Sequence, residues 1–146
     1  MKKVVLISIL SFVLLALCGC TAEEQNNMQI KTNKAVTFVN EVNEADLWLL
    51  PKTQENLKTT VWGKATAAKV KKGESRKTPL CEGGDGGLYL FRMIDTDSMY
   101  YSAGDITLEA GWTMRIYGED LSSITLEVTD QSGEVKGTYE VFAARL

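Results

Sequence analysis

The sequence contains no histidine, the side chain that most often serves enzymes as a general base or a metal ligand. A serine or cysteine nucleophile would therefore lack its usual imidazole partner, and no Ser-x-x-Lys pair replaces it. Glycoside hydrolysis needs two carboxylates positioned in a cleft, and the spacing of the acidic residues selects no such pair. We therefore predict that the protein is not an enzyme and uses no cofactor.

The sequence also lacks an apolar run long enough for an ordinary transmembrane helix. Residues Val4 to Leu17 are almost entirely apolar, but a membrane-spanning helix needs about 20 such residues. Lys2 and Lys3 precede the run, and a small residue follows it, as in a secretory signal peptide. The alternatives are a single transmembrane helix and a signal peptide that is cut elsewhere.

The end of this run, Leu17-Cys18-Gly19-Cys20, resembles the lipobox of bacterial lipoproteins. The resemblance implies cleavage between Gly19 and Cys20 and transfer of a diacylglycerol to the Cys20 thiol, with palmitate-type acyl chains. Two acyl chains are sufficient for stable anchoring. We therefore expect residues 1–19 to be a signal peptide, and the mature protein to be lipid-anchored on the extracytoplasmic face of the cell membrane.

Residues 20–34 combine the predicted lipidated cysteine with a polar, flexible tether. Removing Lys2 and Lys3 from the 16 basic residues leaves 14 against 19 acidic residues, so the mature chain has a formal net charge of −5. Nucleic-acid binding requires a basic stripe, and no such stripe is present. The predicted membrane contact is the lipid on Cys20.

Cysteine is scarce, with three residues in the whole chain. If Cys18 leaves with the signal peptide and Cys20 is acylated, Cys81 has no partner for an internal disulfide. A nucleophilic thiolate needs a nearby base or cation. We expect Cys81 to be a buried, inert thiol, with a reactive thiol as the alternative.

Residues 35–146 show the pattern of many short β-strands. Alternating or continuous apolar runs are separated by polar or glycine-containing turns, and no long helical period occurs. The strongest run, Leu88 to Ile94, is apolar on both faces except at Arg92, which predicts a central strand. The pattern predicts an all-β fold, a small antiparallel β-sandwich of about 7–8 strands, with a small β-barrel as the alternative.

Part of this region, Val36 to Leu108, resembles an uncharacterised module of bacterial envelope and secreted proteins. The matching positions are Leu47-x-Leu49-x-Pro51, Trp62-Gly63, Gly73-Glu74-Ser75 and Leu88-Tyr89-x-x-Arg92-x-x-Asp95-x-Asp97-x-x-Tyr100. Leu90 and Ser98 stand where the module usually has Asp and Gly. The resemblance implies the fold and carries no activity.

Acidic residues near predicted turns form a candidate calcium site. Asp95, Asp97 and Asp105, with the glycine-rich loop Glu82 to Gly87, offer the oxygen ligands that calcium prefers. An EF-hand is excluded, because the segment lacks its glycine and its distal glutamate. The alternative is that these carboxylates cap their own turns. A strand rather than a helix follows the glycine-rich loop, which argues against a phosphate site.

Three tryptophans, Trp48, Trp62 and Trp112, are candidates for stacking on a glycan. Trp48 and Trp112 fall in strand patterns and are expected in the core or on a sheet face. Trp62, next to Gly63 in a polar loop, is the one expected to be exposed or partly exposed, with structural packing as the alternative.

These features lead to three functional hypotheses. The first is a non-catalytic binding or interaction module for another envelope component, either a protein or a glycan. The alternative is a small-ligand or calcium-dependent carbohydrate-binding lipoprotein, with Trp62, Asp95, Asp97 and Asp105 as its candidate residues. A purely structural or assembly role remains a third hypothesis.

Overall fold

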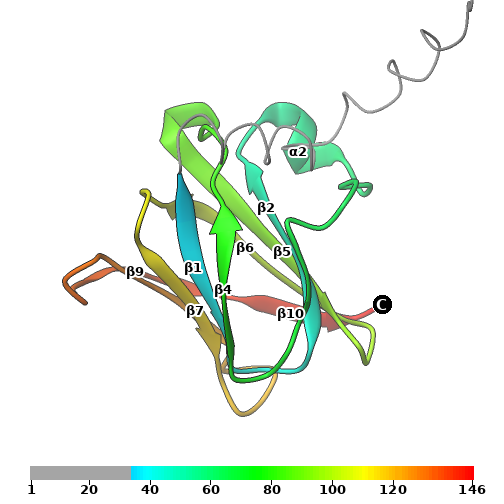
Figure 1. Ribbon diagram of the computed structural model, residues 1–146. Helices are drawn as coiled ribbons and strands as arrows, with labels where there is room; N and C mark the ends of the chain where they lie inside the picture. The colour runs from blue at the N-terminus through cyan, green and yellow to red at the C-terminus, as the bar shows by residue number, and fades with distance from the viewer. Residues whose placement is uncertain (1–33) are drawn as a thin grey trace, which may run out of the picture.

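The computed structural model describes residues 34–146, which form two five-stranded β-sheets packed face to face (Figure 1). The predicted signal peptide, Gly19, Cys20 and the tether up to residue 33 lie outside the described residues. Within residues 34–146, no helix has the length and apolarity that a membrane crossing requires.

The first sheet has the strand order β4-β1-β7-β8-β9. Its strands are β1 (Ala35–Asn40), β4 (Glu74–Pro79), β7 (Thr113–Tyr117), β8 (Thr125–Thr129) and β9 (Val135–Glu140). Neighbouring strands are antiparallel except β1 and β7, which run parallel with Thr37 opposite Thr113. This parallel pair departs from the expected antiparallel arrangement, because the strands that join β1 to β7 lie mainly in the other sheet.

The second sheet has the order β10-β6-β5-β2-β3 and is antiparallel throughout. Its strands are β2 (Ala45–Pro51), β3 (Ala67–Val70), β5 (Leu88–Asp95), β6 (Met99–Thr107) and β10 (Phe142–Arg145). A short helix α2 (Gln54–Lys58) follows β2, and the 3-10 turn η1 (Asp85–Gly87) precedes β5. The central position of β5 confirms the prediction from its apolar sequence.

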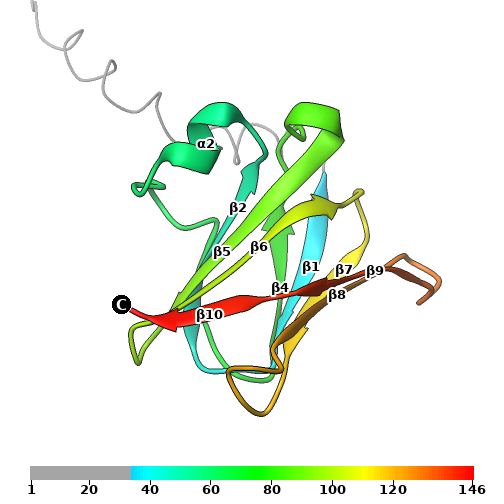
Figure 2. The ribbon, with the colours of Figure 1, turned by 180° about the vertical axis from the view of Figure 1, so that it is seen from behind.

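The C-terminal stretch crosses from one sheet to the other at Val141, as Figure 2 shows for β9 and β10. Val141 is buried, and the Tyr139 hydroxyl accepts a hydrogen bond from the backbone N–H of Thr107 in β6. The crossing brings β9 of the first sheet against β6 of the second at one open side of the sandwich. The two sheets stay separate, so the all-β sandwich is confirmed over the barrel.

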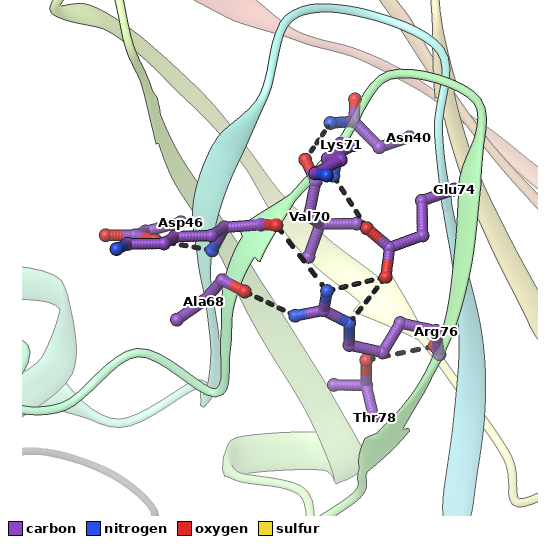
Figure 3. A network of polar contacts seen from close by, with 9 residues as sticks. Asn40, Asp46, Ala68, Val70, Lys71, Glu74, Arg76 and Thr78 are labelled. Carbon is purple, nitrogen blue, oxygen red and sulfur yellow. Dashed lines mark hydrogen bonds and ion pairs between the residues drawn. The ribbon is translucent and has the colours of Figure 1, made fainter.

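The opposite side is crossed by the connection from β3 to β4 (Figure 3). Arg76 of β4 lies 2.5 Å from Glu74 and also donates to the carbonyl oxygen of Ala68 in β3. The Asn40 side chain of β1 donates to the Val70 carbonyl of β3 at 2.8 Å. The bond from Arg76 joins the edge strands β4 and β3, and the bond from Asn40 joins the inner strand β1 to β3, so both connect the two sheets on this side of the sandwich.

The core is a single apolar layer between the sheets. Alternation along the strands points Phe38 of β1 and Phe91 of β5 inward, where both are fully buried with ring centroids 6.2 Å apart. Met93, Met114 and Ile116 are also fully buried and belong to the same cluster. No buried side-chain polar atom of residues 34–146 lacks a hydrogen-bond partner. Complete burial of each large apolar side chain contributes about 1.5–3 kcal/mol.

Two phenylalanines provide a matched test of this core. Replacement of the fully buried Phe38 (Phe38→Ala) is expected to lower the free energy of unfolding by about 3–5 kcal/mol, through lost contacts and a new cavity. Phe142 is 63% exposed, so Phe142→Ala is expected to change it by no more than about 0.5 kcal/mol. Urea unfolding followed by tryptophan fluorescence measures both changes. Equal destabilisation by the two substitutions would contradict this core.

Candidate binding face

Asp95, predicted as a calcium ligand, is a buried acceptor at the β5–β6 turn. Its Oδ1 accepts hydrogen bonds from the backbone N–H groups of Asp97 and Met99, both at 2.9 Å. Its Oδ2 accepts from the Tyr101 hydroxyl at 2.8 Å and from the Asn43 amide at 3.3 Å. Burial, and secondarily the hydrogen bond to Asp95, raise the pKa of Tyr101 above its usual value. The carboxylate is saturated by protein donors and caps its own turn.

The structure separates the other predicted calcium ligands. Asp97 is exposed beside Asp95, whereas Asp105 lies toward the far end of β6. Asp105 adopts a positive φ of 56° at an irregularity of the β5–β6 pairing and forms an ion pair with Lys52. No group of three or more His, Cys, Asp or Glu side chains that could hold a metal ion occurs in residues 34–146. The predicted clustering of Asp95, Asp97 and Asp105 is therefore wrong.

Trp62 belongs to an aromatic cluster on the outer face of the second sheet. Its ring stacks on Tyr100 of β6, with centroids 5.7 Å apart and planes 18° apart, and lies 5.6 Å from Trp48 of β2. Its Nε1 donates to the Thr59 carbonyl, while the Nε1 of Trp48 donates to the Gly63 carbonyl. The cluster is half-buried and fastens the loop after α2 onto the sheet. Trp62 is therefore both packed and partly accessible.

The remaining tryptophan and the cysteine have mainly structural surroundings. Trp112 is partly buried and packs against the core, as its strand pattern predicts. Cys81 is 8% exposed, which confirms its expected burial, and its carbonyl accepts a hydrogen bond from the Tyr89 hydroxyl at 2.6 Å. Burial raises the pKa of Tyr89 to about 12. Cys81 is disulfide-bonded in the unprocessed chain. The expected thiol refers to a mature chain without Cys18 and with a lipidated Cys20, and it stays a prediction.

An open groove lies on the same outer face as the aromatic cluster. It has a volume of about 660 Å³, within the usual range for small-ligand sites. Its lining comes from β5 and β6, from the segment that contains Lys52 and α2, and from the C-terminal crossing. It includes Lys52, Leu57, Arg92, Ser102, Asp105, Glu140 and Phe142. Two of its apolar side chains are exposed, Leu57 at 43% and Phe142 at 63%.

Arg92 connects the groove to the aromatic cluster. On the outer face it lies opposite Trp48 of β2 on one side and Ser102 of β6 on the other. Its Nη1 donates to the carbonyl oxygens of Phe91 at 2.8 Å and Ala103 at 3.2 Å. The sequence marked Arg92 as the one charge in an apolar strand, but it did not indicate that this residue lines a groove. Leu57, Ser102 and Phe142 carried no signal, because only the fold brings them together.

No known protein family, curated protein or solved structure matches this chain.

The hydrogen bonds of Asp95 predict a structural role that does not depend on calcium. Asp95→Ala is expected to lower the free energy of unfolding by about 2–4 kcal/mol, because buried donors lose their acceptor. The exposed neighbour provides the control, and Asp97→Ala is expected to cost no more than about 0.5 kcal/mol. Calcium and EDTA are expected to leave the thermal midpoint of the wild type unchanged. The structural assignment would be contradicted if calcium raised the thermal midpoint of the wild type while Asp95→Ala left that midpoint unchanged.

Proposed function

We propose that the chain is a membrane-anchored extracytoplasmic lipoprotein whose β-sandwich is a non-catalytic binding module for another component of the cell envelope. The lipid anchor is proposed on Cys20, from the sequence Leu17-Cys18-Gly19-Cys20. The binding surface is proposed on the outer face of the second sheet, around the groove that Arg92 and Phe142 line.

The observation that carries the binding role is the combination of hollow shape and exposed apolar side chains at this groove. Leu57 and Phe142 expose large apolar side chains in the groove, and the same face offers a half-buried cation at Arg92. Concave surfaces that combine apolar walls with a few polar groups are typical of ligand sites. The absence of histidine from the sequence supports a binding role rather than catalysis.

A carbohydrate ligand is the second candidate, and the aromatic cluster favours it. Trp48 and Tyr100 flank Trp62 on the same outer face as the groove. Aromatic rings present an apolar face to the C–H face of a sugar ring. Because Asp105 lies apart from Asp95 and Asp97, we propose this candidate without a role for calcium.

The lipid anchor is tested by replacement of the predicted acceptor. Cys20→Ser is expected to abolish incorporation of an alkyne-labelled palmitate and to leave the protein uncleaved, because serine provides no thiol for the thioether. Cys81→Ser is the matched control and is expected to keep both the label and the cleavage. Gel fluorescence and intact mass measure both outcomes. A membrane-derived chain in which Cys81 remains bridged to another cysteine of the same chain would contradict processing, because lipidation consumes the thiol of Cys20 and cleavage removes Cys18.

The binding surface is tested on intact cells with a photoreactive amino acid. Placed at the position of Phe142, p-benzoylphenylalanine is expected to give a discrete crosslinked species, because this side chain lies in the groove. The same amino acid at the exposed Lys77, in β4 of the first sheet, is expected to give none. Equal crosslinking from both positions, or none from either, would contradict a binding surface on this face.

A further inference from the structure

We propose that the groove binds an acidic saccharide and that Arg92 holds its carboxylate. This inference rests on the proposed binding function and names the chemical class of the ligand. It is argued from the absence of a carboxylate partner for Arg92, from the hydrogen bonds of its guanidinium and from the side chains around it.

Arg92 differs from the other half-buried arginines of residues 34–146 in lacking a carboxylate partner. Arg76 lies 2.5 Å from Glu74, and Arg115 lies 2.7 Å from Glu41. Within residues 34–146, Arg92 forms no ion pair with a carboxylate, and its two hydrogen bonds both come from Nη1. Those two bonds hold the guanidinium in place while Nε and Nη2 donate to no residue of this part of the chain. A fixed guanidinium with donors to spare is suited to a carboxylate, which accepts two parallel hydrogen bonds from it.

The surroundings of Arg92 are suited to a sugar rather than to a bare anion. Ser102, opposite Arg92 in the neighbouring strand, provides a hydroxyl in the groove. Asp105 and Glu140 also line it and are exposed, so they can accept hydrogen bonds from sugar hydroxyls. The exposed ring of Phe142 offers a stacking surface for a pyranose. A strongly basic pocket would favour phosphate or sulfate, whereas here Lys52 is already paired with Asp105.

The test uses the full-length chain, purified in a mild detergent, and isothermal titration calorimetry. The probes are tetragalacturonate, a hyaluronan tetrasaccharide and an N-acetylmuramic acid disaccharide, each with its carboxyl-reduced neutral counterpart. At least one acidic probe is expected to bind, and its neutral counterpart to bind at least about tenfold more weakly, because the contact with Arg92 is lost. The affinity is also expected to fall as the salt concentration rises.

Substitutions assign the contact to the groove. Arg92→Met is expected to weaken binding of the acidic probe by at least about tenfold and to leave binding of its neutral counterpart nearly unchanged. Arg115→Met, on the other sheet, is the matched control and is expected to leave the affinity unchanged. Because Arg92 also contacts two backbone carbonyls, the thermal midpoint of each variant is measured, and Phe142→Ala provides a second test at an exposed position. Phe142→Ala is expected to weaken binding of both the acidic probe and its neutral counterpart.

Three results would overturn the inference. The first is equal affinity for an acidic probe and its neutral counterpart. The second is an acidic probe whose affinity changes with neither Arg92→Met nor Phe142→Ala. The third is binding of no saccharide, or preferential binding of tetraglutamate, while position 142 still crosslinks on cells; this result would leave the proposed binding function in place with a different ligand. Failure of both the titrations and the crosslinking would overturn the function as well.

Discussion

The fold depends on one apolar layer that two sheets enclose, with the contact between Phe38 and Phe91 near its centre. Because strand residues alternate between faces, the inward direction of Phe91 and Met93 sends Arg92 outward. A register slip of one residue in β5 would place the guanidinium in the core and two apolar side chains in water. The core therefore also determines which side chains form the candidate binding face.

The two outer faces are not equivalent, because the segment after β2 folds back over part of one of them. The Thr53 side chain caps α2 by accepting a hydrogen bond from the backbone N–H of Asn56. The Asn56 side-chain amide donates to the Pro51 carbonyl. The loop that follows is held by Trp48 and Trp62. The outer face over β5, β6 and β10 remains uncovered. The groove therefore lies where the segment after β2 stops covering the second sheet. Its walls come from segments far apart in the sequence.

Sequence patterns predicted the positions of strands well where one face of the strand is buried. They did not predict which strands pair with each other. The runs around Phe38 and Leu49, and the central position of Leu88 to Ile94, follow from alternation and β-propensity. The parallel pairing of β1 with β7 and the change of sheet at Val141 do not, because neither leaves a local pattern. The predicted cluster of Asp95, Asp97 and Asp105 does not form, because Asp105 lies in an irregular extension of β6, away from the turn at Asp95. The sequence shows Arg92 as a lone charge in an apolar strand. Only the fold shows that none of the carboxylates of residues 34–146 forms an ion pair with it.

The position of β1 has a mechanical consequence. Ala35 begins a strand that is hydrogen-bonded on both sides, to antiparallel β4 and to parallel β7. Tension that reaches the domain through Lys34 acts along this strand, nearly perpendicular to its inter-strand hydrogen bonds. The hydrogen bonds of β1 are then loaded together in shear, and they lie on both sides of the strand, whereas an edge strand would have them on one side only. A domain held by its N-terminal segment and pulled through a ligand on the other sheet would therefore resist unfolding at a strand that is paired on both sides.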